Sequence, residues 1–221
     1  MKKCILGTVF LKSKNFKRYI NWINYYGFNF KDFDLFLAND GDDAEDRLAV
    51  NEILKSVDES IRPRVNFLFF GPPLGRVSHC MFPGWRRSFK ELLKEAGSKK
   101  YDKVIFIETD LYIRKKYIKK YTDLFDEEIY CAGFSDQHNM METSLQILND
   151  NEIRNALISF FETGKELMSN VCSEPQIQSA FNPIINRTKG TRLEGGISNM
   201  HEWEFYAQCD YDTYKNYIEE I

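Results

Sequence analysis

Residues Lys103 to Leu111 read KVIFIETDL, so a run of four apolar residues passes directly into two carboxylates. A short continuous apolar run is typical of a strand that is covered on both faces. Glu108 and Asp110 are separated by one residue, so in an extended chain their side chains point to the same side. Two carboxylates at a buried strand end are electrostatically costly unless a cation or hydrogen-bond donors neutralise them. The stretch therefore predicts a buried strand that ends in a divalent-metal site.

A structural interpretation of the same pair is a cap for the helix predicted over Lys115–Phe125. That helix begins several residues after Asp110, which favours the functional interpretation.

Further apolar runs bounded by turn residues lie on both sides of this stretch, and we expect each to form a strand. They are Ile5–Leu11, Phe33–Ala38, Val65–Phe70 and Ile129–Phe134. The segments between the first four strands repeat apolar residues at the helical period. Their apolar faces hold Phe16, Ile20, Ile23 and Gly27, then Leu48, Ile53, Leu54 and Val57, then Trp85, Phe89, Leu92, Leu93 and Ala96. This alternation predicts an α/β fold with a mostly parallel, doubly wound central sheet, in which ligands bind beyond the C-terminal ends of the strands.

The pattern changes after about Ser135, where we expect a helical or irregular C-terminal region. Helical segments are predicted over Glu142–Met168 and Pro175–Phe181, followed by a glycine-bearing stretch from Lys189 to Asn199. The chain shows no internal repeat, low-complexity tract or Pro/Ser linker, so residues 1–221 are predicted to form one domain.

Composition excludes several classes of protein. The 221 residues are 43% hydrophobic and 29% charged, which excludes global disorder. Thirty Lys and Arg against 33 Asp and Glu give a net charge of -3, which provides no uniform field for nucleic-acid phosphates. The five scattered cysteines indicate free thiols in a reducing compartment, so we expect a cytoplasmic protein. The start of the chain, Met1–Lys3 followed by an apolar run, is interpreted as a first strand rather than a signal peptide, and no stretch is long enough to span a membrane.

A second acidic junction follows the strand predicted over Phe33–Ala38, in the sequence Asn39-Asp40-Gly41-Asp42-Asp43. Gly41 allows a tight turn, which would place the acidic groups at the mouth of the sheet, where they could accept hydrogen bonds from a base or ribose. A turn with a helix N-cap explains Asp42 and Asp43 almost as well.

These motifs, in this order, resemble the nucleotide-sugar half of a GT-A fold glycosyltransferase over roughly Lys3 to Ile113. The resemblance implies that Asp40 contacts the nucleotide. It also implies that Glu108-Thr109-Asp110 stands where the family has its D-x-D motif, binding Mn²⁺ or Mg²⁺ that bridges the diphosphate. Glu replaces the first Asp of the common form, so Asp110 is the main metal ligand and Glu108 binds the metal, ribose or water.

The resemblance implies roles for further residues. Arg86, on the helix before the acidic triplet, is preferred over Arg87 for the nucleotide, with a surface salt bridge as the alternative. The C-terminal half, residues 114–221, would supply the acceptor site. Its candidates are Asp136 and Glu174 as catalytic or acceptor-binding groups, Arg192 for the diphosphate and His201 as a further metal ligand. The stretch from Lys189 to Met200 is expected to close as a lid, or to be an ordinary surface loop.

The expected function is therefore a metal-dependent glycosyltransferase of the hexosyltransferase type, as in polysaccharide biosynthesis. It would use a nucleoside-diphosphate sugar and a saccharide or lipid-linked acceptor. One alternative is a noncatalytic sugar- or protein-binding module of the same fold. Another is a sugar nucleotidylyltransferase, which opens with a glycine-rich loop that Thr8–Lys14 lacks. The basic residues Arg114–Lys116 and Lys119–Lys120 suggest either peripheral contact with an anionic membrane or a solvated helix face.

Overall fold

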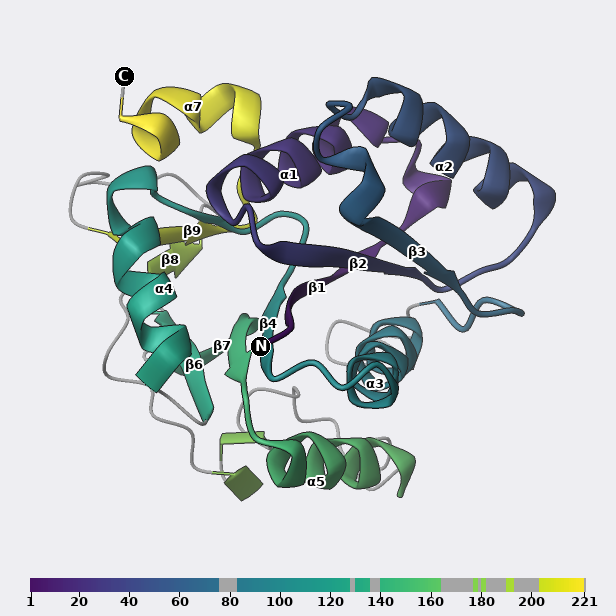
Figure 1. Ribbon diagram of the computed structural model, residues 1–221. Coiled ribbons are helices and arrows are strands. Elements are labelled where there is room, and N and C mark those ends of the chain that lie inside the picture. Colours follow the sequence, from purple (N-terminus) through teal and green to yellow (C-terminus); the bar gives the residue numbers. More distant parts are fainter. Residues whose placement is uncertain are drawn as a thin grey trace.

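A mixed β-sheet in the order β3-β2-β1-β4-β7-β6-β8-β9-β5 runs through the computed structural model (Figure 1). The structure describes residues 1–75, 83–127, 130–135, 140–163, 177–178, 180–181, 190–192 and 203–220. The strands are β1 (Lys3–Val9), β2 (Phe33–Asn39), β3 (Val65–Phe69), β4 (Lys103–Ile107), β5 (Tyr112–Ile113), β6 (Tyr130–Ser135), β7 (Met140–Leu148), β8 (Gly190–Arg192) and β9 (Phe205–Ala207). The helices are α1 (Phe16–Asn29), α2 (Ala44–Ser56), α3 (Pro83–Ser98), α4 (Ile118–Glu127), α5 (Asn151–Glu162) and α7 (Tyr211–Glu219), with short 3₁₀ turns at Leu11–Ser13, Arg62–Arg64 and Lys115–Tyr117.

Strands β1 to β4, the first four along the chain, are parallel to one another. Thr8 pairs with Ala38 and Val9 with Asn39, while Leu6 pairs with Phe106 in β4. The C-terminal ends of β2, β1 and β4 therefore meet at one edge of the sheet. This is the edge at which open α/β sheets bind ligands, so the predicted α/β class is confirmed.

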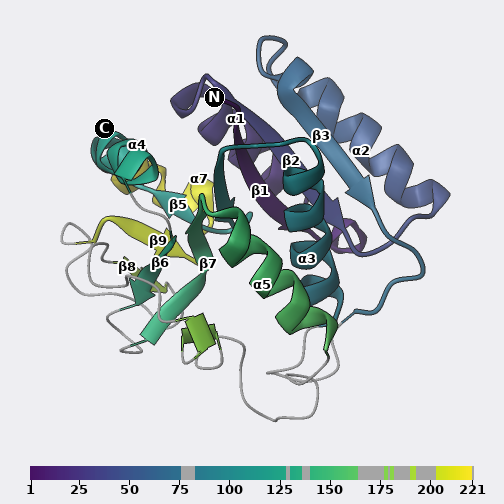
Figure 2. The same ribbon diagram turned by 60° about the horizontal axis from the view of Figure 1, so that its bottom comes forward.

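Helices cover both faces of the sheet and bury a separate apolar layer on each. Helices α1, α2 and α7 lie on one face, and α3 and α5 lie side by side on the other in both views (Figures 1 and 2). Trp22, Ile23 and Tyr26 of α1 pack against Ile5 and Leu35 in the first layer. The second layer holds apolar side chains of α3, α5 and the opposite strand faces, among them Phe36, Phe89, Leu92, Leu93, Phe106 and Leu157. Burial on both faces explains why the strand sequences are continuous apolar runs rather than alternating ones.

The prediction of a helix from Glu142 to Met168 is wrong in its first part. Residues up to Leu148 belong to β7, which pairs antiparallel with β4 and β6, and α5 begins only at Asn151. Strand β7 contains buried polar side chains whose hydrogen bonds are satisfied locally, such as Gln146 Nε2 donating to Thr143 O at 2.8 Å. Those polar residues obscure the apolar strand pattern in the sequence. Residues 164–168, and residues 175, 176 and 179 of the segment predicted over Pro175–Phe181, lie outside the described residues.

Helix α2 also differs from its predicted apolar face. Leu48 is 63% exposed, whereas Ala49, Val50 and Ile53 are buried. The helix begins at Ala44 behind an Asp43 capping box, and its buried side holds Ala49, Val50 and Ile53.

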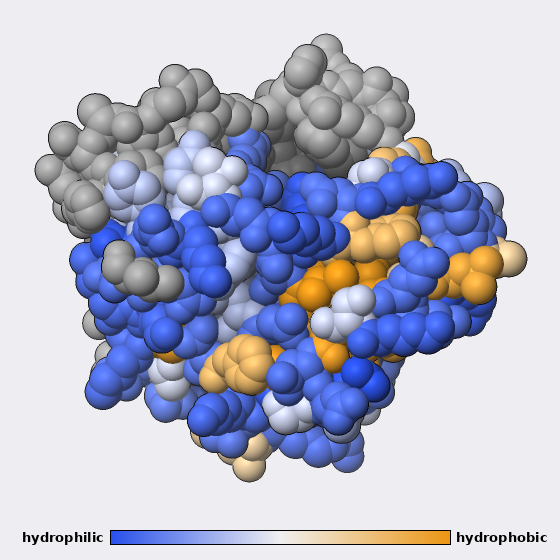
Figure 3. Space-filling view, turned by 90° about the horizontal axis from the view of Figure 1, so that it is seen from above, coloured by the Kyte–Doolittle hydropathy of each residue, from blue (hydrophilic) through white to orange (hydrophobic). Residues whose placement is uncertain are grey.

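The hydrophilic surface agrees with the high content of charged residues, and the described cysteines are free, as their scattered positions predicted. The face that carries α7, α1 and α2 is largely hydrophilic and is interrupted by an apolar strip (Figure 3). Cys4, Cys131 and Cys209 are buried free thiols, as predicted. In the part of the chain that the structure describes, no helix is long and apolar enough to cross a membrane.

Candidate functional site

The turn Glu108–Asp110 follows β4 at the C-terminal edge of the sheet and is held by hydrogen bonds from several elements. Leu111 N donates to Glu108 O at 3.0 Å and closes the turn. Thr109 Oγ1 donates to Thr8 O at 2.8 Å, which ties the turn to the end of β1. Glu108 N donates to Ser144 O of β7 at 2.8 Å. The two carboxylates of the triplet are therefore carried by a fixed backbone.

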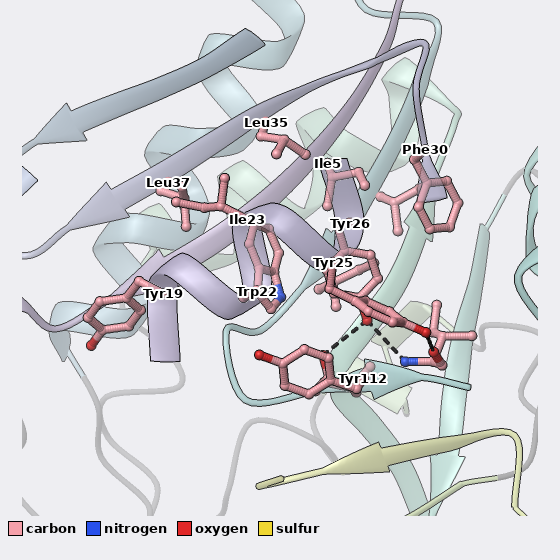
Figure 4. Packing of buried hydrophobic residues seen from close by; sticks show 14 of the residues in the cluster. Ile5, Tyr19, Trp22, Ile23, Tyr25, Tyr26, Phe30, Leu35, Leu37 and Tyr112 are labelled. Carbon is pink, nitrogen blue, oxygen red and sulfur yellow. Dashed lines mark hydrogen bonds between the residues drawn. The ribbon is translucent and has the colours of Figure 1, made fainter. Parts of the chain in front are cut away.

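Aromatic residues of α1 and the C-terminal segment complete this support. Trp22 Nε1 donates to Glu108 O at 3.0 Å, and Cys209 N, just after β9, donates to Asp110 O at 2.7 Å. Tyr26 Oη donates to Leu111 O at 3.0 Å and accepts from Ile113 N at 3.0 Å. Figure 4 shows Trp22 and Tyr26 projecting from α1 beside Tyr112, within the same apolar layer. The acidic triplet and the chain after it are anchored to the core.

Glu108 lies in an unusually negative environment. Its side chain is partly buried, and the pKa of its carboxyl is raised from the ordinary 4.5 to about 8. The first cause is burial, followed by the nearby carboxylates of Asp110 and Glu142, while Trp85 and Arg18 act in the opposite direction. The carboxylates of Glu108 and Asp110 therefore influence each other, and Glu142 acts on Glu108 in the same direction.

Glu142 was not singled out from the sequence. It is 2% exposed on β7, and its Oε1 accepts hydrogen bonds from Ser144 Oγ at 2.7 Å and from Ser144 N at 3.3 Å. The stretch MMETSLQIL was predicted to be helical from Glu142 onward. A strand that would carry Glu142 to the acidic triplet was therefore not expected.

Arg18 of α1 is the second residue beside the acidic triplet that was not singled out from the sequence. Its Nη2 lies 2.9 Å from Asp110 Oδ2, and its Nε donates to Thr109 O at 3.2 Å. Arg18 and Trp22 are four residues apart, so they share a helix face, and both contact the acidic triplet. The sequence shows the spacing of Arg18 and Trp22, but it does not show that this face of the helix contacts residues 108–110.

Asp40, at the end of β2, lies at the neighbouring junction and is enclosed by donors of the protein itself. Its Oδ2 accepts from Leu74 N and Gly75 N, both at 2.8 Å, and its Oδ1 pairs with Nη2 of Arg87. A Cβ at Gly84 would lie 2.1 Å from Asp40 Oδ2, so this close approach requires glycine.

Arg87 extends the same cluster to the loop after β3. Its Nη2 also donates to Phe70 O at 2.9 Å and to Pro72 O at 2.8 Å. The structure thus brings Arg87 rather than Arg86 to Asp40. Arg86 is 4% exposed on α3, and its proposed contact with a nucleotide stays a prediction, as does that of Asp40.

The structural interpretation of the remaining acids at this junction holds. Asp43 is the N-cap of α2, accepting from Asp46 N at 2.9 Å in a reciprocal capping box. Asp42 pairs with Arg47 at 2.6 Å on the surface.

The other predicted site residues are placed only in part. Asp136, Glu174 and His201 lie outside the described residues, and for Arg192 the structure describes the backbone in β8 alone. The stretch predicted to form a lid is described only at β8.

The basic residues around α4 are all paired with acids. Arg114 is buried and pairs with Glu220, and the lysines pair within 3.2 Å with nearby carboxylates. These pairs are Lys115–Glu219, Lys116–Glu220, Lys119–Asp123 and Lys120–Glu204. This pairing favours the interpretation of a solvated helix face over a membrane-binding patch.

The donor set at the end of β4 fits a divalent cation of the Mg²⁺ or Mn²⁺ type. The described part of the chain contains no group of three or more His, Cys, Asp or Glu side chains arranged to hold a metal ion. Such a cation, however, is commonly held by one or two carboxylates together with substrate phosphates. Burial raises the pKa of Glu108, and the nearby carboxylates of Asp110 and Glu142 raise it further, so added positive charge is favourable at this place.

Solved structures with similar architecture identify the fold. The galactosyltransferase LgtC, crystallised with donor and acceptor sugar analogues, is 12% identical, with a TM-score of 0.56 over 93% of this chain and 87% of its own. The chain has the fold of GT-A glycosyltransferases. GlyE of Streptococcus pneumoniae gives a TM-score of 0.52 at 12% identity over 96% of this chain and 55% of its own. The mannosyltransferase PcManGT of Pyrobaculum calidifontis, solved with GDP-Man and Mn²⁺, gives 0.51 at 7% identity over 70% of this chain and 46% of its own.

Similarity in sequence is much lower than similarity in structure. No protein-family profile matches the chain, and no curated protein matches it. The chain spans 36% of a crystallised fragment of S. aureus TarS, residues 1–349, with a TM-score of 0.42. The GT-A fold predicted from the order of motifs is confirmed.

Proposed function

We propose that this protein is a glycosyltransferase that moves a hexose from a nucleoside-diphosphate sugar to a hydroxyl group of a saccharide or lipid-linked acceptor. The observation that carries the proposal is the gathering of Glu108, Asp110 and Glu142 beyond the C-terminal end of β4 in a GT-A fold. The LgtC and PcManGT structures hold donor and acceptor sugar analogues and GDP-Man with Mn²⁺, respectively, which supports this class of ligand.

Asp110 and Glu108 would hold the divalent cation, Mn²⁺ or Mg²⁺, which when bound stabilises the negative charge of the leaving diphosphate. The hydrogen bonds from Thr109, Trp22 and Cys209 keep these carboxylates on a backbone that does not need to reorganise when the ligand arrives. Asp110 is the stronger candidate of the two, because burial and the nearby carboxylates raise the pKa of Glu108 to about 8, which favours its protonated form at neutral pH.

The donor would lie across the mouths of β1, β2 and β4. Asp40 and Arg87 fix the shape of the loop Phe70–Gly75, which borders this mouth beside the start of α3. We assign Asp40 and Arg86 to the nucleotide end of the donor, and Arg192 to its diphosphate. Bringing cationic groups to a diphosphate favours its departure as an anion.

The acceptor side is assigned to the C-terminal half. Glu174 or Asp136 would orient the acceptor hydroxyl and remove its proton, and His201 would add a ligand to the cation. The stretch Lys189–Met200 would close over the donor and exclude water, which protects an activated sugar from hydrolysis. Free buried thiols agree with a reducing compartment such as the cytoplasm, where polysaccharide precursors are assembled from sugar nucleotides.

The test separates an enzyme from a binding module. Purified protein is incubated with UDP-, GDP-, CMP- or dTDP-sugars, with Mn²⁺ or Mg²⁺ or with EDTA, and release of free nucleotide is followed. We expect slow metal-dependent hydrolysis of at least one donor, accelerated by the right acceptor and lost in Asp110→Asn. The matched control is Asp42→Asn, which removes an acid from the surface pair with Arg47 and should retain the activity. Tight donor binding with no turnover under any condition would identify a binding module instead.

A further inference from the structure

Arg18 gives the acidic site a positive group from within the chain. It is the third residue of α1, its side chain is 35% exposed, and its guanidinium reaches the carboxylate of Asp110 and the carbonyl oxygen of Thr109 at the same time. A guanidinium in contact with a carboxylate fixes the orientation of that carboxylate more strictly than a lysine would, because its donors are coplanar.

The neighbours of Arg18 on α1 show that this contact is specific. Lys17 pairs with Asp212 at 2.9 Å, and Asn21 donates to the same carboxylate at 3.3 Å. Those contacts dock α7 on α1 away from the triplet. Lys17 therefore provides a matched comparison, since it carries the same charge on the same turn of the helix but does not contact residues 108–110.

We propose that Arg18 is a positioning residue that holds the Asp110 carboxylate in the donor-free protein and competes with the divalent cation for it. The inference rests on the proposed function for the existence of the cation site. The guanidinium need not leave the turn when the cation binds, because its Nε bond to Thr109 O and its Nη2 contact with Asp110 use different atoms. Nη2 would then be released toward the mouth of the sheet, where a diphosphate oxygen is a suitable partner.

The competition has a measurable consequence in the absence of any nucleotide. Removing a positive charge that contacts a cation ligand should strengthen cation binding, whereas a purely structural role would weaken it or leave it unchanged. We expect Arg18→Gln to bind Mn²⁺ about tenfold more tightly than wild type, a part of the full Coulomb effect because Arg18 is partly exposed. Arg18→Lys retains the charge and should stay within about threefold of wild type.

The experiment titrates Mn²⁺ alone into each folded variant and measures free Mn²⁺ by electron paramagnetic resonance. Lys17→Gln is the control for net charge and should bind Mn²⁺ as wild type does. The double variant Arg18→Gln/Asp110→Asn tests whether the effect acts through Asp110. The tighter Mn²⁺ binding of Arg18→Gln should disappear when the Asp110 carboxylate is absent.

Unchanged or weaker Mn²⁺ binding in Arg18→Gln would overturn the inference, as would an equal gain in Lys17→Gln or a gain that persists without Asp110. If wild type binds no Mn²⁺, appearance of binding in Arg18→Gln supports competition and continued absence overturns it. Failure of the proposed function is a separate result. It would appear as tighter Mn²⁺ binding in Arg18→Gln together with no binding or turnover of any sugar nucleotide.

Discussion

The junctions after β2 and β4 are both acidic, but the protein uses their carboxylates differently. After β2, each acid is matched by donors of the chain itself: Asp40 by Arg87 and two backbone N–H groups, and Asp43 by the start of α2. After β4, three acids lie together with one partly exposed arginine, Arg18, which pairs with Asp110. Burial and the carboxylates of Asp110 and Glu142 raise the pKa of Glu108.

The difference teaches that an acidic strand end is not by itself a binding site. Carboxylates that are each matched by donors of the chain shape loops and cap helices. A cluster of three carboxylates with one partly exposed arginine keeps an excess of negative charge, which favours an added cation. By this criterion the β4 junction is the stronger candidate for the proposed cation site, and the β2 junction shapes the loop Phe70–Gly75 beside it. The following substitutions test that division, beginning with the largest expected effect.

Asp110→Asn should break the function of the β4 junction without harming the fold. A neutral amide binds a hard cation poorly, so metal-dependent sugar transfer should fall by at least about a hundredfold, the upper end of the loss seen when only an outer-shell partner is removed. Initial rates at saturating Mn²⁺, together with the thermal unfolding midpoint, measure the two effects. Near-wild-type transfer would remove Asp110 from the site.

Asp40→Asn, unlike Asp110→Asn, should have a large effect on stability. The amide would leave Arg87 without its charged partner and turn a donor toward groups that donate, which costs about 2–3 kcal/mol in the free energy of unfolding. Chemical denaturation measures this loss. Asp42→Asn, at the exposed pair with Arg47, should cost less than about 0.5 kcal/mol. Equal costs for the two variants would contradict a structural role for Asp40.

Glu108→Gln should make the protein more stable at high pH. A carboxyl whose pKa is 4.5 when unfolded and about 8 when folded binds its proton more strongly in the folded state. The folded state therefore loses stability as pH rises from about 4.5 to about 8. Glutamine is neutral throughout, so at about pH 9 we expect the variant to gain about 1 kcal/mol over wild type, with a smaller difference at about pH 5. Denaturation curves in metal-free buffer at both values check it; a constant difference would place Glu108 in ordinary surroundings.

Much of the fold could be predicted because its parallel strands are buried on both faces. The prediction for β2 ended at Ala38 and the strand ends at Asn39, while the prediction for β4 began at Val104 and the strand begins at Lys103. Such continuous apolar runs depend on little besides local sequence. Strand β7 was missed because its buried Glu142 and Gln146 depend on partners that only the folded chain supplies.

The candidate site could be predicted only where its residues are close together in the sequence. Glu108 and Asp110 are separated by one residue and follow a strand that the sequence predicts, so their proximity could be inferred. Glu142 and Arg18 reach them from β7 and α1, and neither contact leaves a local trace in the sequence. The contact of Asp40 with a nucleotide stays a prediction, and nothing in the sequence indicated that Asp40 also accepts hydrogen bonds from the loop after β3.

The most direct test of the β4 junction as a sugar-nucleotide site is a thermal-shift screen of wild type and Asp110→Asn. Each protein is melted with UDP-, GDP-, CMP- and dTDP-sugars, in Mn²⁺ and in EDTA. We predict that at least one sugar nucleotide raises the Tm of wild type in Mn²⁺, that EDTA abolishes the rise, and that Asp110→Asn shows none. An equal rise in Asp110→Asn, or no rise in wild type with any of these donors, would contradict the account.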